Sequence, residues 1–167
     1  MSLRASIAQS MWALGNLGSA RRFTKAVNDP EAAQARWLRD HLAADAESAF
    51  GNEHGFREIR SYQDFARRVP LRAWNDFEPW VKRIHAGEPS VLGMDRVTHL
   101  APTSGSSGAR KLIPFSTGLQ KGFSEAVGAW MTDLTRLEPD LLGGSAYWSV
   151  SPLTSGDENE KGAVPVG

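Results

Sequence analysis

The sequence predicts an α/β protein in which a helical N-terminal region leads into the first strands of a sheet. Apolar residues recur at helical spacing as far as residue 87, and capping residues precede several of these stretches. Beyond residue 90, short apolar runs replace that spacing, and a loop rich in serine and glycine joins two of them. We therefore expect a helical region over residues 1–90 and the start of an α/β region over residues 91–167, within one truncated domain.

The first helix is expected over residues 3–27. Its large apolar residues lie three and four positions apart and form one helical face: Ile7, Met11, Leu14 and Leu17. Gly15 and Gly18 are expected to loosen or break the helix near its middle. The stretch faintly resembles a secretory signal, but polar residues interrupt it and two arginines follow it directly. We therefore interpret it as a helix of the mature protein.

A second helix is expected from Pro30 to Phe50. Asn28 and Asp29 offer capping side chains, and proline suits the first helical position. Gly51 is expected to end the helix. The side of this helix predicted to be buried consists of Trp37, Leu38, Leu42, Ala46 and Ala49. His41 and His54 are expected to be solvated, with no carboxylate or thiol cluster to make either a metal ligand.

Two shorter helices are expected before residue 90. The first begins at the capping-box-like stretch 61–64, runs through Arg68 and is closed by Pro70. The second is capped by Asn75 or Asp76 and ends near residue 87, with Pro79 in its first turn. Its apolar face comprises Phe77, Trp80, Val81 and Ile84. Glu78 and Glu88 are interpreted as helix-end or surface charges rather than as catalytic acids.

The second half is expected to contain strands and one long helix. Strands are predicted at residues 96–100 and 111–115, joined by the loop rich in serine and glycine. Ser116 is expected to cap a helix over residues 117–137. The inner face predicted for this helix consists of Phe123, Val127, Trp130, Met131 and Leu134. A further strand is expected at residues 146–150.

The composition restricts the classes of function. Nineteen basic and nineteen acidic residues balance to zero, so the net charge supports neither a nucleic acid nor an anionic membrane as a partner. The absence of cysteine excludes disulfides, thiolate metal sites and thiol catalysis, and it is typical of a reducing cytoplasm, where we expect the protein to be. No run of apolar residues reaches the ~20 needed to span a bilayer.

The stretch that most resembles a binding site is residues 103–111, Thr-Ser-Gly-Ser-Ser-Gly-Ala-Arg-Lys. Glycine lets backbone N–H groups turn toward an anion, hydroxyls add donors and the two cations supply charge, a combination that suits a triphosphate. The spacing is neither that of the P-loop of kinases and GTPases nor that of a hydrolase nucleophile elbow. No histidine follows residue 99. From the residues alone, a plain surface loop remains the alternative.

Together with its neighbours, this loop resembles the first nucleotide motif of the adenylate-forming, acyl-activating enzymes. The stretches 69–71, 77–84 and 86–90 precede it in the expected order, and Arg-Lys-Leu-Ile-Pro at 110–114 follows. These sequence stretches are similar to those of the auxin-responsive acyl acid–amido synthetase family in its bacterial form. The similarity covers roughly the second half of the chain. The loop is a residue shorter than in plant members. Arg110 replaces the proline usual in the wider superfamily, although it fits the amido synthetases.

The resemblance implies a ligase that acts in two steps. A carboxylate attacks the α-phosphate of ATP, giving an acyl-adenylate and pyrophosphate, and the amine of an amino acid then forms an amide and releases AMP. ATP and Mg²⁺ are the implied cofactors, and a small carboxylic acid and an amino acid are the implied substrates. The residues that the resemblance assigns to nucleotide binding are Thr103, Ser104, Gly105, Ser106, Ser107, Gly108, Arg110 and Lys111. No catalytic residue or metal ligand is assigned.

Members of the resembled family are much longer, with a second nucleotide motif and a C-terminal lid that are not found in these 167 residues. We therefore expect an N-terminal fragment with an incomplete sheet, which by itself does not turn over substrate. Two alternatives remain open. One is a non-catalytic helical module that docks on a partner through a tryptophan-rich face, and the other is a fragment that does not fold stably alone. Nucleotide-dependent behaviour that disappears in Lys111→Ala distinguishes the enzyme from the binding module.

Overall fold

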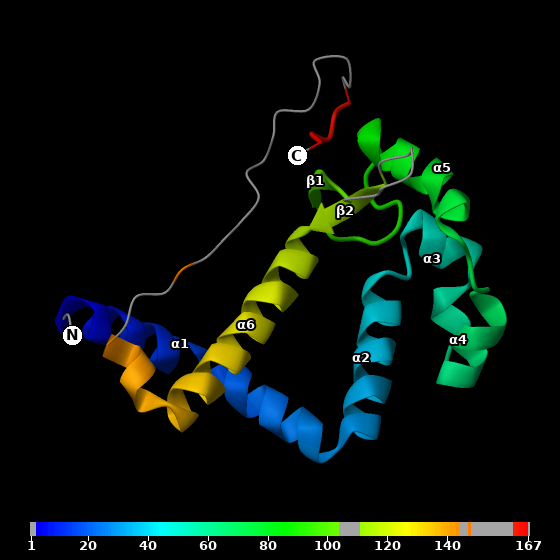
Figure 1. The fold of residues 1–167 in the computed structure, drawn as a ribbon. Helices are drawn as coiled ribbons and strands as arrows, with labels where there is room; N and C mark the ends of the chain where they lie inside the picture. The colour runs from blue at the N-terminus through cyan, green and yellow to red at the C-terminus, as the bar shows by residue number, and fades with distance from the viewer. Residues whose placement is uncertain (1–2, 104–110, 144–146, 148–161, 167) are drawn as a thin grey trace. The chain divides into compact units, whose positions relative to one another are not determined.

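The computed structural model of the chain describes residues 3–103, 111–143, 147 and 162–166 (Figure 1). These residues are mostly helical and include a two-stranded antiparallel sheet, which confirms the predicted fold class. The elements in chain order are α1 (Leu3–Asn28), α2 (Pro30–Ala44), α3 (Ala49–Glu53), η1 (Phe56–Glu58), α4 (Tyr62–Arg68), α5 (Trp74–His85), β1 (Val97–Pro102), β2 (Leu112–Ser116), α6 (Thr117–Leu137) and η2 (Pro139–Gly143).

The chain divides into two compact units. Unit 1 comprises Met1–Ala33 and Gln120–Ser151, and unit 2 comprises Gln34–Leu119 and Pro152–Gly167. Unit 1 therefore contains α1, most of α6 and η2, which packs on α1. Unit 2 contains most of α2, together with α3, η1, α4, α5 and the β1–β2 hairpin.

In unit 1, α1 runs without interruption from Leu3 to Asn28, so the break expected near Gly15 and Gly18 is wrong. A glycine costs about 1 kcal/mol relative to alanine within a helix, but it retains both backbone hydrogen-bonding groups. Two such residues therefore weaken a helix of 26 residues without ending it. The face that carries Ile7, Met11 and Leu14 is exposed.

Helix α6 has the predicted bounds and the predicted cap, since the backbone N–H of Leu119 donates to Ser116 Oγ at 3.1 Å. Its predicted inner face is confirmed only in part, because Val127, Met131 and Leu134 are partly buried. Phe123 and Trp130 are exposed, and the residues that α6 buries are small: Gly128, Ala129 and Thr132. The reason is a close approach, because a Cβ added to Gly128 would overlap the side chain of Asn16 in α1. Large side chains cannot lie between helices at that separation.

Unit 2 holds an apolar core centred on Phe50 of α3. Its ring packs edge-on against Trp80 at 5.3 Å and against Phe56 at 6.0 Å between ring centroids. Helix α5 buries Trp80, Val81 and Ile84, while Phe77 packs against the core from a partly buried position, so the predicted face is confirmed. The buried residues of this core are Leu42, Ala46, Phe50, Phe56, Ile59, Trp80, Val81, Ile84, Val91, Leu100 and Val166.

The single helix expected from Pro30 to Phe50 is instead two helices, because Ser48 starts a new one. Its Oγ accepts a hydrogen bond from the N–H of Gly51 at 2.9 Å and donates to the carbonyl of Asp45 at 2.8 Å. Gly51, the expected terminator, therefore lies inside α3. A Cβ added to Gly51 would overlap the carbonyl oxygen of Asp45. The space at this position therefore accommodates glycine but no larger residue. Leu42 and Ala46 are buried as predicted.

Two aromatic side chains of this region differ from their predictions. Trp37, expected inside, is 62% exposed and stacks on His41 with ring centroids 3.8 Å apart. His54, expected in solvent, is buried and stacks on Phe50. Arg72, which can only donate, lies 2.9 Å from His54 Nε2, so this nitrogen accepts and Nδ1 donates to the carbonyl of Phe50 at 2.9 Å. A partner for each ring nitrogen is what allows this histidine to be buried.

Helix α4 follows its predicted cap. Ser61 Oγ accepts from the N–H of Asp64 at 3.1 Å. Hydrogen bonds from the Ser61 side chain and from the N–H of Arg60 lower the pKa of the Asp64 carboxyl. Helix α5 begins earlier than predicted, after Ala73, whose N–H donates to Asp76 Oδ2 at 2.8 Å. Asp76 therefore caps from the third helical position, and Pro79 lies in the second turn rather than the first.

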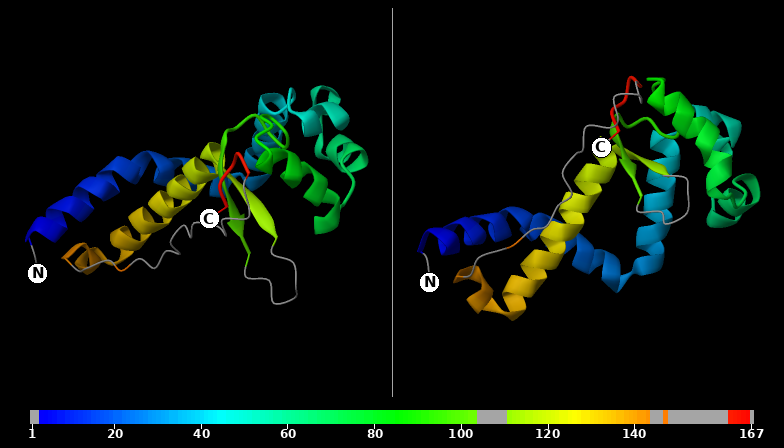
Figure 2. Two further views of the ribbon diagram at one scale, coloured as in Figure 1. Left: turned by 90° about the horizontal axis from the view of Figure 1, so that it is seen from above. Right: turned by 45° about the horizontal axis from the view of Figure 1, so that its top comes forward.

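The predicted strands are confirmed within two residues, as β1 and β2, and they pair in antiparallel fashion (Figure 2). Val166 forms a parallel bridge with Leu100, whose N–H donates to the carbonyl of Pro165 at 2.9 Å. Strand β1 therefore lies between β2 and the chain at Val166. The strand predicted at 146–150 falls outside the described residues apart from Tyr147, which has no regular structure.

Glu78 and Glu88 both make ordinary surface ion pairs. Glu78 Oε1 lies 2.9 Å from Lys82 Nζ on the next turn of α5. Glu88 accepts from two nitrogens of Arg83, at 2.8 Å and 2.5 Å. The Arg83 hydrogen bonds lower the pKa of the Glu88 carboxyl. These contacts agree with the interpretation of both residues as surface charges.

The Arg83–Glu88 pair is expected to make stability depend on pH at the acid end. Because the folded-state pKa of Glu88 is lowered, its contribution is present above the ordinary pKa of a glutamate and is lost as pH falls through the lowered value. We expect the thermal midpoint of Glu88→Gln to lie below that of the parent at about pH 7, with the difference closing by about pH 3. A difference that stays constant with pH would contradict the assignment.

Candidate functional site

The β1–β2 hairpin holds the two ends of the predicted nucleotide loop together. The N–H of Thr103 donates to the carbonyl of Lys111 at 2.9 Å, directly beyond the last strand pair, Pro102 with Leu112. Both Thr103 and Lys111 are exposed. The other loop residues predicted to bind nucleotide lie outside the described residues: Ser104, Gly105, Ser106, Ser107, Gly108 and Arg110. The structure therefore brings together the first and last of the predicted residues.

Two prolines lie in this hairpin without costing it a ladder hydrogen bond. Leu100 turns its N–H away from β2 toward Pro165, so its pair with Pro114 is not a hydrogen-bonded one. The missing N–H of Pro114 consequently faces away from β1, where the ladder needs no donor. Pro102, two residues after Leu100, has the same orientation. The regular pairing therefore continues to the base of the loop.

The base of the hairpin is anchored in the core of unit 2. Leu100 is fully buried, and Val97 and Leu112 pack against the same core from partly buried positions. Thr98 Oγ1 donates to the carbonyl of Phe115 at 2.9 Å across the two strands. A loop that leaves a core-anchored hairpin begins and ends at defined positions, which is what precise placement of a ligand requires.

Lys111 is the charged residue of this loop that the structure describes. Lys111 is exposed and makes no ion pair with any residue that the structure describes. Among the described residues there is also no group of three or more histidine, cysteine, aspartate or glutamate side chains that could hold a metal ion. The described part of the loop therefore offers a cation and a hydroxyl, which suit an anionic ligand, and the described residues supply no carboxylate cluster.

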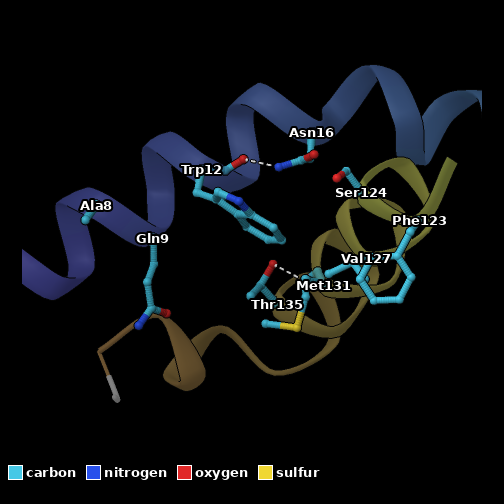
Figure 3. A pocket seen from close by; sticks show the side chains of 9 residues that line it. All are labelled: Ala8, Gln9, Trp12, Asn16, Phe123, Ser124, Val127, Met131 and Thr135. Atoms are coloured by element: carbon cyan, nitrogen blue, oxygen red, sulfur yellow. Dashed lines mark hydrogen bonds between the residues drawn. The ribbon is translucent and has the colours of Figure 1, made fainter. Parts of the chain in front are cut away.

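Sequence reasoning missed an apolar groove between α1 and α6 in unit 1. It has a volume of about 580 Å³, and none of its lining residues is charged: Ala8, Gln9, Trp12, Asn16, Phe123, Ser124, Val127, Met131 and Thr135 (Figure 3). The Asn16 side chain donates to the carbonyl of Trp12 at 2.8 Å, and Thr135 Oγ1 donates to the carbonyl of Met131 at 2.9 Å. These bonds satisfy the polar groups locally and leave an apolar surface.

The pairing of Leu100 with the C-terminal residues was also missed. A signal for it exists in the sequence, because Ala163, Val164 and Val166 form a short apolar run. In the described residues, none of the helices is both long enough and apolar enough to cross a membrane.

The fold resembles part of a solved structure, and the sequence matches a family model. A solved structure, that of the GH3.15 acyl acid amido synthetase, superposes with a TM-score of 0.61 over 71% of this chain and 22% of that one, at 24% sequence identity. This likeness concerns the fold. Residues 19–163 match the GH3 family N-terminal domain, so the chain belongs to the GH3 family. The family predicted from the loop and its neighbours is thereby confirmed.

Two rice proteins are curated relatives. The indole-3-acetic acid-amido synthetase GH3.8 of Oryza sativa subsp. indica is 28% identical over 102 residues, which are 60% of this chain and 17% of that protein. The putative indole-3-acetic acid-amido synthetase GH3.10 of Oryza sativa subsp. japonica is 29% identical over 100 residues, 58% of this chain and 21% of that protein. The chain thus matches about a fifth of the length of these ligases.

Proposed function

We propose that residues 103–111 form the phosphate-binding loop of an acyl acid–amido synthetase, which activates a carboxylic acid with ATP and joins it to an amino acid. The observation that carries the proposal is the closure of this loop on a core-anchored hairpin, between Thr103 and Lys111. The hairpin belongs to a GH3-family chain whose curated relatives are amido synthetases. Both the sequence of the loop and the position of its ends support this role.

The proposed contacts follow from the chemistry of the loop. Backbone N–H groups of residues 105–108 and the hydroxyls of Ser104, Ser106 and Ser107 donate to the β- and γ-phosphates. Thr103 begins the loop, and Lys111 adds positive charge at its other end, with Arg110 beside it. Adenylation requires mainly that the reactants be positioned and that the charge developing on the leaving pyrophosphate be neutralised. A fixed loop base contributes to the first requirement and Lys111 to the second.

The rest of the reaction is proposed at the level of class. Mg²⁺ serves as the counterion of ATP, and the described residues give no basis for assigning it a ligand in this chain. The substrates are a small carboxylic acid and an amino acid, and no catalytic residue is assigned. Because the chain lacks cysteine and therefore needs no oxidising compartment, we place the activity in the cytoplasm.

Thermal unfolding with and without Mg-ATP tests the loop. A ligand that binds only the folded state raises the midpoint by mass action, and we expect a rise of a few degrees for the parent chain at saturating nucleotide. Lys111→Ala is expected to remove most of this rise, because it deletes a cation at the base of the loop. Lys121→Ala serves as the matched control, since Lys121 is also exposed but lies on α6.

Two outcomes contradict the phosphate-binding proposal. One is a cooperative melt that Mg-ATP does not move, and the other is an equal loss of the nucleotide effect in both lysine variants. Either result favours a binding module without nucleotide chemistry, for which the exposed Trp12, Trp37 and Trp130 would provide contact surface. Absence of any cooperative melt would mean that residues 1–167 do not form a stable unit alone, and the test would then move to a longer member of the family.

A further inference from the structure

Residues 162–166 form a segment (the 162–166 segment) that docks on the C-terminal end of α5. The N–H groups of Ala163 and Val164 both donate to the carbonyl of His85, at 2.9 and 3.3 Å. Gly162 lies directly on the His85 ring, because a Cβ added to Gly162 would overlap its Cδ2 and Nε2 atoms. The Nε2 atom is buried and has no hydrogen-bond partner among the described residues. Close packing therefore holds this contact together with the two backbone bonds.

A second glycine makes room for the segment just beyond α5. Gly87 has a φ of 93°, in the left-handed region that favours glycine. A Cβ added to Gly87 would lie only 2.6 Å from the Cβ of Ala163. Both Gly87 and Gly162 thus lie where a larger residue would push the segment away from the helix.

The other end of the 162–166 segment completes the hydrogen bonding of β1 (Figure 2). The N–H of Leu100 faces away from β2 and donates to the carbonyl of Pro165 at 2.9 Å, and Val166 forms a parallel bridge with Leu100. Leu100 and Val166 are both buried in the core of unit 2. If the segment left, Leu100 would lose its hydrogen-bond partner and the core would lose an apolar side chain, both of which destabilise the fold.

This pairing lies close to the base of the proposed phosphate-binding loop. Leu100 precedes Thr103 by three positions on the same strand, and the Thr103 N–H closes the loop on the Lys111 carbonyl at 2.9 Å. A hairpin of two strands is only marginally stable by itself and needs a further strand or other packing. The 162–166 segment provides this support on the side of β1 that β2 does not cover.

We propose that the 162–166 segment positions the phosphate-binding loop, with Gly162 and Val166 as positioning residues that act through Leu100. The segment holds β1 against the end of α5, and β1 holds the base of the loop. The identity of the ligand rests on the function proposed above, whereas the coupling between segment and loop base does not. Because coupling between two sites is reciprocal, nucleotide binding at the loop also stabilises the docked segment.

The competing explanation is that β2 and the core hold the loop base without the segment. Val97 and Leu112 pack against the core, and Thr98 bonds to the carbonyl of Phe115 across the two strands. None of these contacts replaces the partner that Pro165 gives to the N–H of Leu100. The two explanations differ in one respect, which is whether the loop base opens when the segment undocks.

Hydrogen exchange of single backbone amides, followed by NMR on the whole chain, distinguishes the two explanations. The informative amides are those of Ala163 in the segment, Leu100 in β1 and Thr103 at the loop base. The amide of Phe65, which donates to the carbonyl of Ser61 at 3.0 Å, serves as a reference in α4 of the same unit. In the parent without nucleotide, we expect Thr103 to exchange at least as readily as Ala163, because undocking exposes both. A Thr103 amide that stays protected while Ala163 exchanges would overturn the proposal.

Gly162→Ala tests the contact with His85. The added methyl group should push the segment off α5 and speed exchange of Ala163 and Leu100 roughly tenfold or more, while Phe65 is unaffected. Gly122→Ala on α6 is the matched control, because no atom lies within 4 Å of a Cβ at Gly122, and it should change these rates by less than about twofold. An unchanged Leu100 rate, or an equal increase at Phe65, would overturn the proposal. If Gly162→Ala fails to fold, the measurements on the parent decide.

Mg-ATP provides the reciprocal test on the parent. At about ten times Kd, the nucleotide should slow exchange of Thr103, Leu100 and Ala163 alike, by roughly tenfold, and leave Phe65 unchanged. Slower exchange at Thr103 without any change at Ala163 would retain the nucleotide site but overturn the positioning role. If Mg-ATP slows none of the amides, the proposed phosphate site is wrong. The measurements without nucleotide then decide the coupling between segment and loop base by themselves.

Discussion

Replacement of Leu100 by alanine is expected to lower the free energy of unfolding by about 3 kcal/mol, within the usual range for a buried leucine. Leu100 is fully buried in β1 and lies between Pro114 of β2 and Val166. Deleting its side chain removes apolar contacts and leaves a cavity under the hairpin that carries the proposed phosphate loop. The same variant should therefore weaken any stabilisation by Mg-ATP. Urea unfolding followed by far-UV circular dichroism measures the first effect, and thermal melts with nucleotide measure the second.

The same substitution at Leu71 provides the matched control. Leu71 also belongs to unit 2, but its side chain is completely exposed. Its removal should change the unfolding free energy by less than about 0.5 kcal/mol. Equal effects of Leu100→Ala and Leu71→Ala would contradict the core described above.

Gly51→Ala is expected to destabilise the protein by about 2 kcal/mol, which is opposite in sign to the usual effect of this change within a helix. The added Cβ would overlap the carbonyl oxygen of Asp45 and lie 3.0 Å from Ser48 Oγ. To make room, the turn between α2 and α3 must shift. This turn holds the cap of α3, and Asp45 Oδ1 also accepts from the N–H of Met94 at 2.7 Å.

Gly15→Ala on α1 is the companion experiment, because it makes the same chemical change where there is space. No atom lies within 4 Å of a Cβ at Gly15. Alanine should therefore stabilise the helix by about 0.5 to 1 kcal/mol, through its better helix propensity. Thermal unfolding followed by far-UV circular dichroism measures the change in stability of both variants. If Gly51→Ala stabilised the protein to the same extent as Gly15→Ala, the tight turn at Asp45 would be refuted.

Features that depend on a few adjacent residues could be read from the sequence. Ser61 and Ser116 start α4 and α6 where they were expected, because a capping side chain bonds to an N–H only three residues away. The hairpin strands were found because a Ser/Gly run between two apolar runs predicts a turn. The candidate loop came from the same local chemistry, and the structure adds that Thr103 and Lys111 lie one hydrogen bond apart.

Other features could not be read locally, because they depend on which distant segment lies nearby. The sequence between Ala44 and Ala49 continues a helical pattern, yet the helix ends because the Ser48 cap and the Met94 N–H hold Asp45 in a turn. His54 was expected in solvent but is buried. Arg72, eighteen positions later, supplies the hydrogen bond that allows its burial.

The sequence by itself thus determined the fold class, the starts of α4 and α6, the position of the hairpin and the family to which the chain belongs. Only the tertiary structure decided which faces of α1 and α6 are buried. A hydrophobic period shows that a helix has an apolar side, but the space available between two elements decides what fits there. Asn16 lies so close to Gly128 that α6 buries its small residues and leaves Phe123 and Trp130 exposed. That separation is set by two segments more than a hundred residues apart, and no local pattern records it.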